Sequence, residues 1–353
     1  MRARGPDPRG HLRAHERVPA ALSPVRGGEG ERDRAGEAVK YLVQADGSIP
    51  NLALLRLARY FRDRGEPVRF VHGYGQRQLW DPPGEVIGSS LFTSSAPIRA
   101  ALEREWGPIR WGGTGVAVSS SLAEIDPAVE WDAVLPDYSD HPAEDRSIGF
   151  TQRGCRLRCR FCVVPAKEGS ARSTGSLPAI WRGGQHPRKL LLLDNDFFGQ
   201  PREAWKARLA EARAGGFRLS LLQGINVRLI DEEQARELAT VEYRDQAFHE
   251  RVLYTAWDDV RDEARFRGGV ATLAANGVPA KHLRVYMLVG FAPGETWDAI
   301  MHRFEVITGL GCEAFPMPYG DRPDLRAFAR WAIRGIWRNV PWGMYRDRRK
   351  RAA

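Results

Sequence analysis

Three cysteines lie close together near the middle of the chain, at Cys155, Cys159 and Cys162. Thiolates are ligands for soft metal centres, and closely spaced cysteines are general ligands of iron–sulfur clusters. The surrounding sequence supplies no fourth cysteine, since the only other one is Cys312. The spacing therefore indicates a metal or iron–sulfur site with three local thiol ligands.

Two other interpretations of the cysteines are weaker. A structural zinc site needs four ligands, usually as two separated pairs, and here the fourth would be Cys312 or a distant histidine such as His186. Disulfides are disfavoured because four cysteines in 353 residues, with no apolar N-terminal signal segment, fit a reducing cytosol. An iron–sulfur site is preferred, zinc stays open as an alternative, and Cys312 is expected to be a buried thiol.

Four arginines surround the thiols, at positions 153, 156, 158 and 160. Their positive charge is expected to favour thiolate over thiol and to offset the negative charge of a ligated cluster. A solvated basic loop is the alternative for these side chains.

The Cys-x3-Cys-x2-Cys spacing, with Phe161 just before the last thiol, resembles the signature of the radical S-adenosylmethionine (SAM) enzymes. In that superfamily three thiolates hold three irons of a [4Fe–4S] cluster, and SAM chelates the open fourth iron. The resemblance therefore implies both cofactors and reductive cleavage of SAM to a 5′-deoxyadenosyl radical. It also implies an electron donor such as flavodoxin or ferredoxin.

From residue 147 the chain alternates apolar runs with helical patterns, which predicts a parallel α/β fold. The expected strands are Ile148–Thr151, Leu190–Leu193, Leu219–Gln223, Val252–Trp257, Leu283–Val289 and Glu313–Met317. The expected helices are Arg202–Ala214, Asp231–Ala239, Val260–Asn276 and Thr296–Leu310. Six such repeats fit the partial (β/α)6 barrel of the resembled superfamily, assigned to residues 144–322. Because parallel barrels place their chemistry at the C-terminal strand ends, the cysteine loop falls there.

The resemblance also implies SAM contacts at successive strand ends. The residues that match by order and type are Phe161, Asp194, Asn195, Asp196, Gln223, Asn226, Arg228, Met287, Val289 and Gly290. Asp194, Asn195 and Asp196 stand in place of the family's Gly-Gly-Glu element, which contacts the SAM amino group. Arg228 could pair with the SAM carboxylate. The apolar strand before Gly290 would hold the adenine. A turn or N-cap role for each aspartate, and a rim ion pair for Arg228, are the alternatives. Met317 or Tyr319 would face substrate.

Residues 37–143 predict a doubly wound, Rossmann-like domain, with strands near Tyr41–Ala45, Val68–Val71, Val86–Gly88, Ile109–Trp111 and Ala133–Leu135 and helices at Asn51–Arg64 and Ala96–Trp106. Its pattern resembles the cobalamin-binding-type domain of one radical SAM class, so cobalamin and methyl transfer stay open. The Asp-x-His-x-x-Gly motif that supplies the lower ligand of the cobalt is absent around His72. Gly112–Gly115 is a glycine-rich turn that could approach a phosphate or corrin. Methylthiolation is disfavoured because no cysteine precedes Cys155.

The two ends of the chain differ from its body. Residues 1–36 are rich in Arg, Gly and Pro, lack aromatic residues and are expected to be disordered. Residues 323–353 predict a C-terminal helix over Leu325–Asn339 and a basic tail, where nucleic-acid contact is a secondary possibility for a chain of net charge +9. With no apolar run long enough to span a bilayer, a cytoplasmic protein without membrane contact is expected. The sequence does not identify the substrate.

Overall fold

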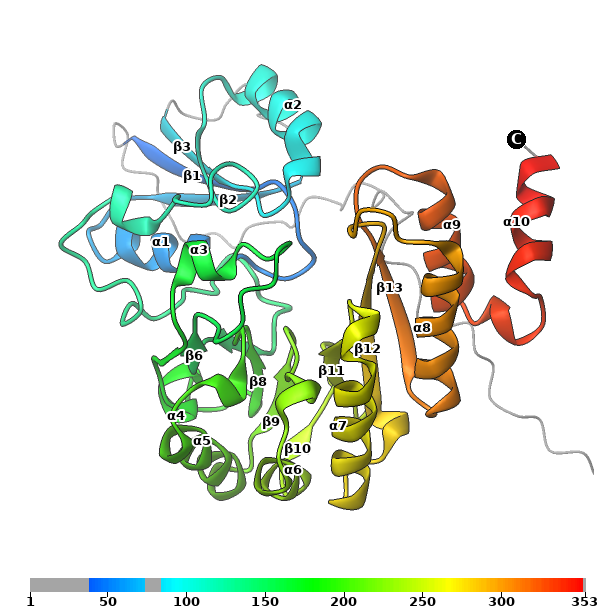
Figure 1. The fold of residues 1–353 in the computed structure, drawn as a ribbon. Helices are drawn as coiled ribbons and strands as arrows, with labels where there is room; N and C mark the ends of the chain where they lie inside the picture. The colour runs from blue at the N-terminus through cyan, green and yellow to red at the C-terminus, as the bar shows by residue number, and fades with distance from the viewer. Residues whose placement is uncertain (1–37, 74–83, 352–353) are drawn as a thin grey trace, which may run out of the picture. The chain divides into compact units, whose positions relative to one another are not determined.

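The computed structural model describes residues 38–73 and 84–351, with side chains through Arg346 (Figure 1). The expected disordered segment 1–36 lies outside the described residues. The chain divides into two compact units, residues 1–115 and 116–353, and each is described by itself. Residues 116–143, which the sequence pattern assigns to the first domain, group with the second unit.

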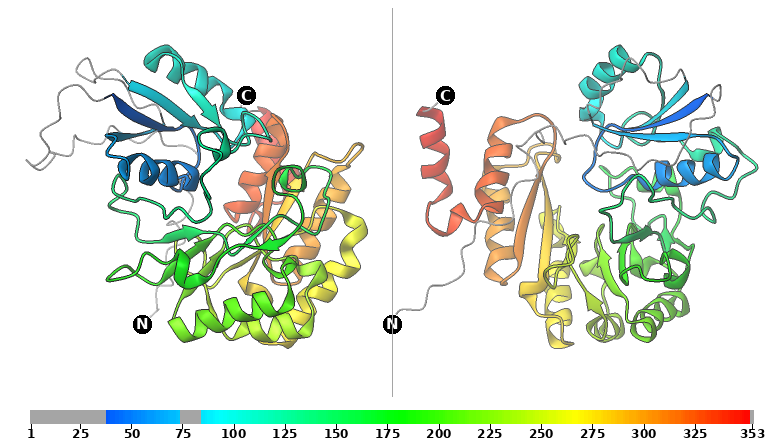
Figure 2. Two further views of the ribbon diagram at one scale, coloured as in Figure 1. Left: turned by 90° about the vertical axis from the view of Figure 1, so that its left-hand side faces the viewer. Right: turned by 180° about the vertical axis from the view of Figure 1, so that it is seen from behind.

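The first unit contains a four-stranded parallel sheet in the order β2-β1-β3-β4. The strands are β1 (Val39–Gln44), β2 (Val68–His72), β3 (Gly84–Ser89) and β4 (Arg110–Gly112). Helices α1 (Leu52–Arg62) and α2 (Ala96–Trp106) cover opposite faces of this sheet (Figures 1 and 2). The connection from β1 through α1 to β2 and the connection from β3 through α2 to β4 run in opposite directions across the sheet. Because such connections are right-handed, the two helices lie on opposite faces.

One predicted strand of this region is wrong. Residues 133–135 form no strand: Ala133 closes a turn in which its N–H donates to the carbonyl of Glu130 at 3.0 Å, and the backbone at Leu135 is irregular. Trp131 is the buried residue of the segment, and its indole N–H donates to the carbonyl of Asp126, whereas Leu135 is exposed. A run of three apolar residues is too short to distinguish a buried strand from a turn.

The second unit is an α/β layer structure built on parallel strands (Figure 1). Its two main sheets have the orders β10-β9-β8-β5 and β11-β12-β13. The strands are β5 (Ser147–Gly149), β8 (Lys189–Leu192), β9 (Arg218–Leu221), β10 (Glu242–Tyr243), β11 (Leu253–Ala256), β12 (Leu283–Val289) and β13 (Glu313–Pro318). All six expected strands are present with ends shifted by at most two residues, and β10 is an additional short edge strand.

Helices follow the strands along the outside of these sheets (Figures 1 and 2). They are α4 (Leu177–Ile180), α5 (Arg202–Gly215), α6 (Glu232–Ala239), α7 (Glu263–Ala275) and α8 (Trp297–Gly309). Strand β12 shows how the sheet divides its side chains: Leu283, Val285, Met287 and Val289 are fully buried in the core, and the alternate residues are partly exposed. On that second face, Tyr286 stacks on Tyr254 and meets the edge of Phe315.

The C-terminal part of the second unit packs through aromatic side chains. Helix α9 (Pro323–Ile333) buries Phe328 and Trp331 against α8, and helix α10 (Trp342–Arg351) adds Trp342 to the same cluster. The helix expected at Leu325–Asn339 therefore begins two residues earlier and ends in a short 3-10 turn, Ile336–Arg338. Within the described ranges, none of the helices has both the length and the apolar character needed to cross a membrane.

A buried ion pair connects three of these elements. Arg303 of α8 is fully buried, and its guanidinium donates to the carbonyls of Trp257, which follows β11, and Leu288, which lies in β12. The same guanidinium pairs with Glu295, whose other carboxylate oxygen accepts the N–H of Gly290 at 2.6 Å. This one side chain thus fixes the C-terminal ends of two neighbouring strands relative to α8.

Replacing Arg303→Ala is expected to lower the free energy of unfolding by about 3–5 kcal/mol, because it leaves the Glu295 carboxylate buried without its partner. Urea denaturation measures the change. The double variant Arg303→Ala/Glu295→Ala should lose much less than the sum of the two single losses. Arg261→Ala, which removes the highly exposed partner of Asp259, is the control and should cost under about 1 kcal/mol. If Arg303→Ala and Arg261→Ala lowered the free energy of unfolding by similar amounts, the buried ion pair would stabilise the fold no more than an exposed one.

Candidate functional site

The three clustered cysteines lie on a loop whose two ends are held together by a short antiparallel pair. Strand β6 (Gln152–Arg153) pairs with β7 (Arg172–Ser173), so residues 154–171 form a closed loop that follows β5. Gly154 has φ +75°, and a Cβ there would lie 2.2 Å from the carbonyl oxygen of Ser170. Only glycine therefore allows the two ends of the loop to approach this closely.

All three thiols line one pocket. The cavity has a volume of about 420 Å³, and its lining residues are Cys155, Arg158, Cys159, Cys162, Pro165, Ala166, Gly169 and Ser170. Short local contacts shape this part of the loop: the N–H of Cys162 donates to the carbonyl of Cys159 at 3.0 Å, and the N–H of Leu157 donates to the sulfur of Cys155 at 3.3 Å. The sequence predicted the thiols as one site, and the structure brings them to one cavity of the size that holds small ligands.

Cys312 does not belong to this pocket. It is buried in the hydrophobic core of the second unit, and burial raises the pKa of its thiol to about 12. The expectation of a buried thiol at this position is confirmed. A protonated thiol enclosed by apolar side chains is a poor metal ligand.

Two of the four arginines near the thiols are engaged by carboxylates. Arg153 pairs with Asp132 at 3.0 Å and with Glu168 at 2.9 Å, and its guanidinium also lies over the ring of Phe150. Arg156 pairs with Asp196 at 2.8 Å. Their charges are therefore largely balanced, and only Arg158 and Arg160 are exposed without a described ion pair.

The expected lowering of the thiol pKa is not found. Burial raises the pKa of Cys155 and of Cys162, and the backbone N–H donors of Leu157 and Val164 offset this only in part. In the described residues, no group of three His, Cys, Asp or Glu side chains is arranged around a single ion position. Ligation at this pocket therefore requires that the thiols release protons and that the loop adjusts around the metal centre.

The segment that follows β8 anchors the cysteine loop. Asp194 is 2% exposed, and its carboxylate accepts the N–H groups of Thr151 at 2.7 Å and Gln152 at 3.1 Å as well as the Thr151 hydroxyl. Gln152 in turn accepts the N–H of Asp196 at 2.9 Å and donates to the carbonyl of Gly154. Asp194 thus holds the start of the loop in position.

Neither Thr151 nor Gln152 stands out in the sequence. Their importance comes from position, because they lie between β5 and β6 and face the end of the neighbouring strand. The sequence signal that could have indicated them is only that polar residues follow a buried strand directly. Many turns share this pattern.

Asn195 and Asp196 have different surroundings. Asp196 is buried and receives Arg156 from the cysteine loop, although burial raises the pKa of its carboxyl group. Asn195 is partly buried, and its amide nitrogen Nδ2 has no hydrogen-bond partner among the described residues. A buried donor without a partner is uncommon and indicates a place where a water molecule or a ligand binds.

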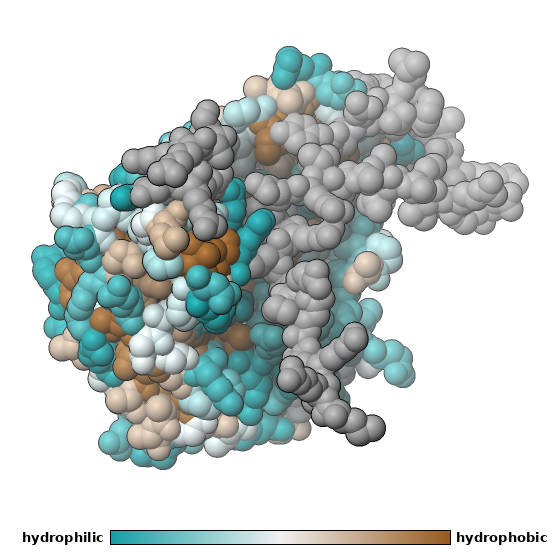
Figure 3. All heavy atoms as spheres, turned by 90° about the vertical axis from the view of Figure 1, so that its right-hand side faces the viewer, coloured by the Kyte–Doolittle hydropathy of each residue, from teal (hydrophilic) through white to brown (hydrophobic). Residues whose placement is uncertain are grey.

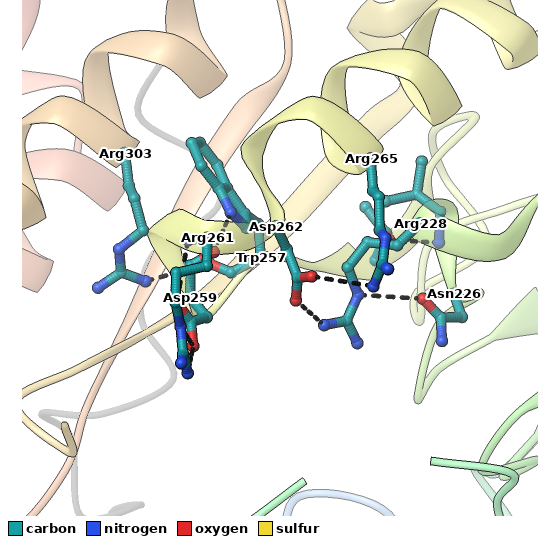
Figure 4. A network of polar contacts seen from close by, with 10 residues as sticks. Asn226, Arg228, Trp257, Asp259, Arg261, Asp262, Arg265 and Arg303 are labelled. Carbon is teal, nitrogen blue, oxygen red and sulfur yellow. Dashed lines mark hydrogen bonds and ion pairs between the residues drawn. The ribbon is translucent and has the colours of Figure 1, made fainter.

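The polar residues after β9 form a network with the start of α7 (Figure 4). Arg228 donates to Asp262 at 2.6 Å and to the amide oxygen of Asn226 at 3.3 Å, as the alternative of a rim ion pair predicted. Burial lowers the pKa of Arg228, but Asp262 and the nearby Cys159 outweigh it, so the pKa is raised. The amide nitrogen of Asn226 is buried without a partner in the described structure, and Gln223 is exposed.

The predicted adenine segment consists of the end of β12 and Gly290. Met287 and Val289 have fully buried side chains in the core between sheet and helices, so neither presents a side chain to a ligand on the other face. Gly290 has φ +84°, and a Cβ there would lie 2.3 Å from Leu325 of α9, so helix packing accounts for this glycine. The alternate residues Tyr286 and Leu288, which belong to the same segment but are not among the predicted SAM contacts, have the opposite orientation.

Aromatic contacts join the cysteine loop to the last strands. The ring of Phe161 meets Phe291 edge-on with centroids 5.4 Å apart, and Phe291 meets Tyr319 in the same way at 5.0 Å. Phe291 follows β12, and Tyr319 follows β13. Phe161, Met317 and Tyr319 are exposed. The loop after the first strand of the unit therefore reaches the ends of the last two.

The features linked to cobalamin lie in the first unit. His72 ends β2, and the residues that follow at 74–83 lie outside the described residues. In the glycine-rich turn, a Cβ at Gly113 would clash with the carbonyl of Ser90 and one at Gly115 with the backbone of Phe92. Close packing of two loops accounts for these glycines.

Comparisons with known proteins add no assignment. Neither a family model nor a curated protein sequence matches this chain. The site is therefore interpreted from its own residues.

Gly154→Ala is expected to open the cysteine loop. Its matched control is Gly169→Ala, since Gly169 has φ +74° but a Cβ there would meet no atom of another segment within 4 Å. The control should cost about 1–2 kcal/mol for the left-handed backbone alone, and Gly154→Ala should cost clearly more. Urea denaturation and the rate of thiol alkylation measure both effects. Equal stability losses and equal alkylation rates would show that the contact with Ser170 does not hold the loop.

Asp194 is expected to make stability depend on pH. Burial raises the pKa of its carboxyl group to about 6 despite the donors of Thr151 and Gln152, so between about pH 4 and 6 the native state retains a proton that the unfolded state has lost. The free energy of unfolding should therefore fall by roughly 3 kcal/mol as the pH rises through this range. Asp194→Asn should remove this pH-dependent fall, which denaturation at several pH values measures. If the free energy of unfolding of the variant depended on pH in the same way as that of the unmodified protein, the prediction would be wrong.

Proposed function

We propose that this chain is a radical SAM enzyme, in which Cys155, Cys159 and Cys162 bind a [4Fe–4S] cluster. The observation that carries the proposal is that all three thiols line one cavity on the loop directly following the first of a series of parallel strands. In parallel α/β folds the carboxyl ends of strands are where chemistry is placed. On this proposal, the second unit corresponds to a partial (β/α)6 barrel and the first to a Rossmann-like domain.

The donor set fits a four-iron cluster better than a single ion. A cubane cluster binds each cysteine through a different iron, so it accepts three sulfurs that do not surround one point. A structural zinc ion instead requires four ligands around one centre, and no such group is arranged among the described residues. The remaining thiol, Cys312, is enclosed in the core. The fourth iron would therefore lack a cysteine ligand.

The surrounding residues supply positive charge and hydrogen-bond donors that suit an iron–sulfur cluster and SAM. Arg228, held by Asp262, lies close enough to Cys159 to interact with its sulfur and would offset the negative charge of the ligated cluster. The partnerless amide nitrogens of Asn195 and Asn226 would donate to a carboxylate or hydroxyl group. When bound, the cluster supplies the electron that cleaves SAM reductively.

The chain's own residues would also control access. Phe161, Phe291 and Tyr319 form a row of rings beside the cysteine loop, and this apolar row would limit the entry of water. Arg153 closes the base of the loop through Asp132 and Glu168. The loop thus combines a fixed base with an aromatic side, which suits a reaction that must be kept from solvent.

Anaerobic reconstitution with iron and sulfide is expected to load about four irons and four sulfides per chain. Incubation with SAM and dithionite should then yield 5′-deoxyadenosine, measured by chromatography. Cys159→Ala should abolish product formation and lower the iron content. The absorption spectrum of the same sample would also reveal a corrinoid.

Cys312→Ala is the matched control, since it removes a thiol of the same chain from the core instead of the pocket. This variant should keep its iron and its product. A protein that takes up one zinc ion and no iron, or a Cys312→Ala protein that loses iron as Cys159→Ala does, would overturn the proposal.

A further inference from the structure

The positive charge of this protein is concentrated at its C-terminal end. Residues 322–351 contain nine arginines and one lysine against Asp324 and Asp347, a net charge of +8, while the whole chain carries +9. The remaining residues are therefore nearly neutral in total. A charge so segregated produces a local positive field, which a uniformly solvated surface does not.

The arginines recur at every fourth position along α9 and the turn after it. They are Arg322, Arg326, Arg330, Arg334 and Arg338. Residues four apart advance about 6 Å along a helix and stay on neighbouring parts of one face. Arg326, Arg334 and Arg338 are exposed, and Arg330 is partly buried. The stripe therefore runs along α9 through Arg326 and Arg330 and continues with Arg334 and Arg338 in the turn that follows the helix.

The opposite face of α9 is fully occupied. Leu325, Phe328 and Trp331 are buried in the core of the second unit, where Phe328 and Trp331 pack on Phe304. A helix that binds a lipid surface must insert its apolar face among the acyl chains. Since that face of α9 is already committed, an anionic membrane is the less suitable partner.

Arginine in place of lysine favours phosphate as the recognised group. The planar guanidinium donates two parallel hydrogen bonds to a phosphate, whereas a lysine ammonium acts as a point charge. Hydrophilic side chains cover much of the described part of the surface on this side (Figure 3). Arginines that recur along α9 and the turn after it suit a ligand that carries several phosphates in a row.

We propose that α9 and the start of α10 form a binding surface for the sugar–phosphate backbone of a nucleic acid, with Arg330, Arg334 and Arg338 as its centre. Arg322 and Arg326, at the N-terminal end of the stripe, pair with Asp324 and Asp321, and the two acidic side chains lower the net positive charge of this end. The inference is independent of the proposed iron–sulfur chemistry, because none of these residues lines the cysteine pocket. Binding through phosphates carries no base sequence preference.

Fluorescence anisotropy with a labelled single-stranded RNA and a labelled DNA duplex tests the proposal on the full chain. Between about 50 and 200 mM salt, the logarithm of the association constant should fall linearly with the logarithm of salt concentration. The triple variant Arg330→Gln/Arg334→Gln/Arg338→Gln should bind at least about tenfold more weakly, with a slope reduced by about 2–3, as loss of three phosphate contacts predicts.

The control variant is Arg202→Gln/Arg236→Gln/Arg261→Gln, which removes the same charge from exposed positions of the same unit. It should keep most of the affinity and nearly the full slope. Because Arg330 is partly buried, the double variant Arg334→Gln/Arg338→Gln, with its fold checked by circular dichroism, must also reduce the slope. Equal losses in the two triple variants would overturn the proposal. Binding to anionic lipid vesicles with no measurable binding to either nucleic acid would also overturn it.

Discussion

The contact on which the candidate site most depends is the junction between the end of β8 and the start of the cysteine loop. There the Asp194 carboxylate accepts two backbone N–H groups and a hydroxyl from Thr151 and Gln152. Those residues would otherwise leave buried donors without partners, because they lie beyond the end of the β5 ladder. A single buried carboxylate thus fixes the point where the cysteine loop leaves the sheet. The positions of the three thiols depend on that point, because they lie on the same loop.

Electrostatic balance around the thiols is the second constraint. The sequence places four arginines near three cysteines, but Arg153 and Arg156 form ion pairs with nearby carboxylates. Burial raises the pKa of the Cys155 and Cys162 thiols and so disfavours their thiolate forms. Arg228, which lies beside Cys159, comes from a distant part of the chain.

The arginines of the C-terminal helix contrast with those of the cysteine loop. Every fourth residue of α9 is an arginine, and the intervening apolar residues fill the core between α8, α9 and α10. The period of the pattern assigns one side of this helix to packing and the other to solvent. Arginines that close a loop and arginines that face outward therefore occur in the same unit.

The amino-acid pattern was enough to predict the alternation of strands and helices, the positions of the six strands of the second unit, and the grouping of the three thiols. These features depend on local periodicity and spacing. Three features became clear only from the folded chain: residues 133–135 form no strand, Asp194 is an anchor, and Met287 and Val289 are directed into the core. The reason is physical: the face that a strand residue presents, and the partner that a buried charge receives, depend on elements far away in the chain.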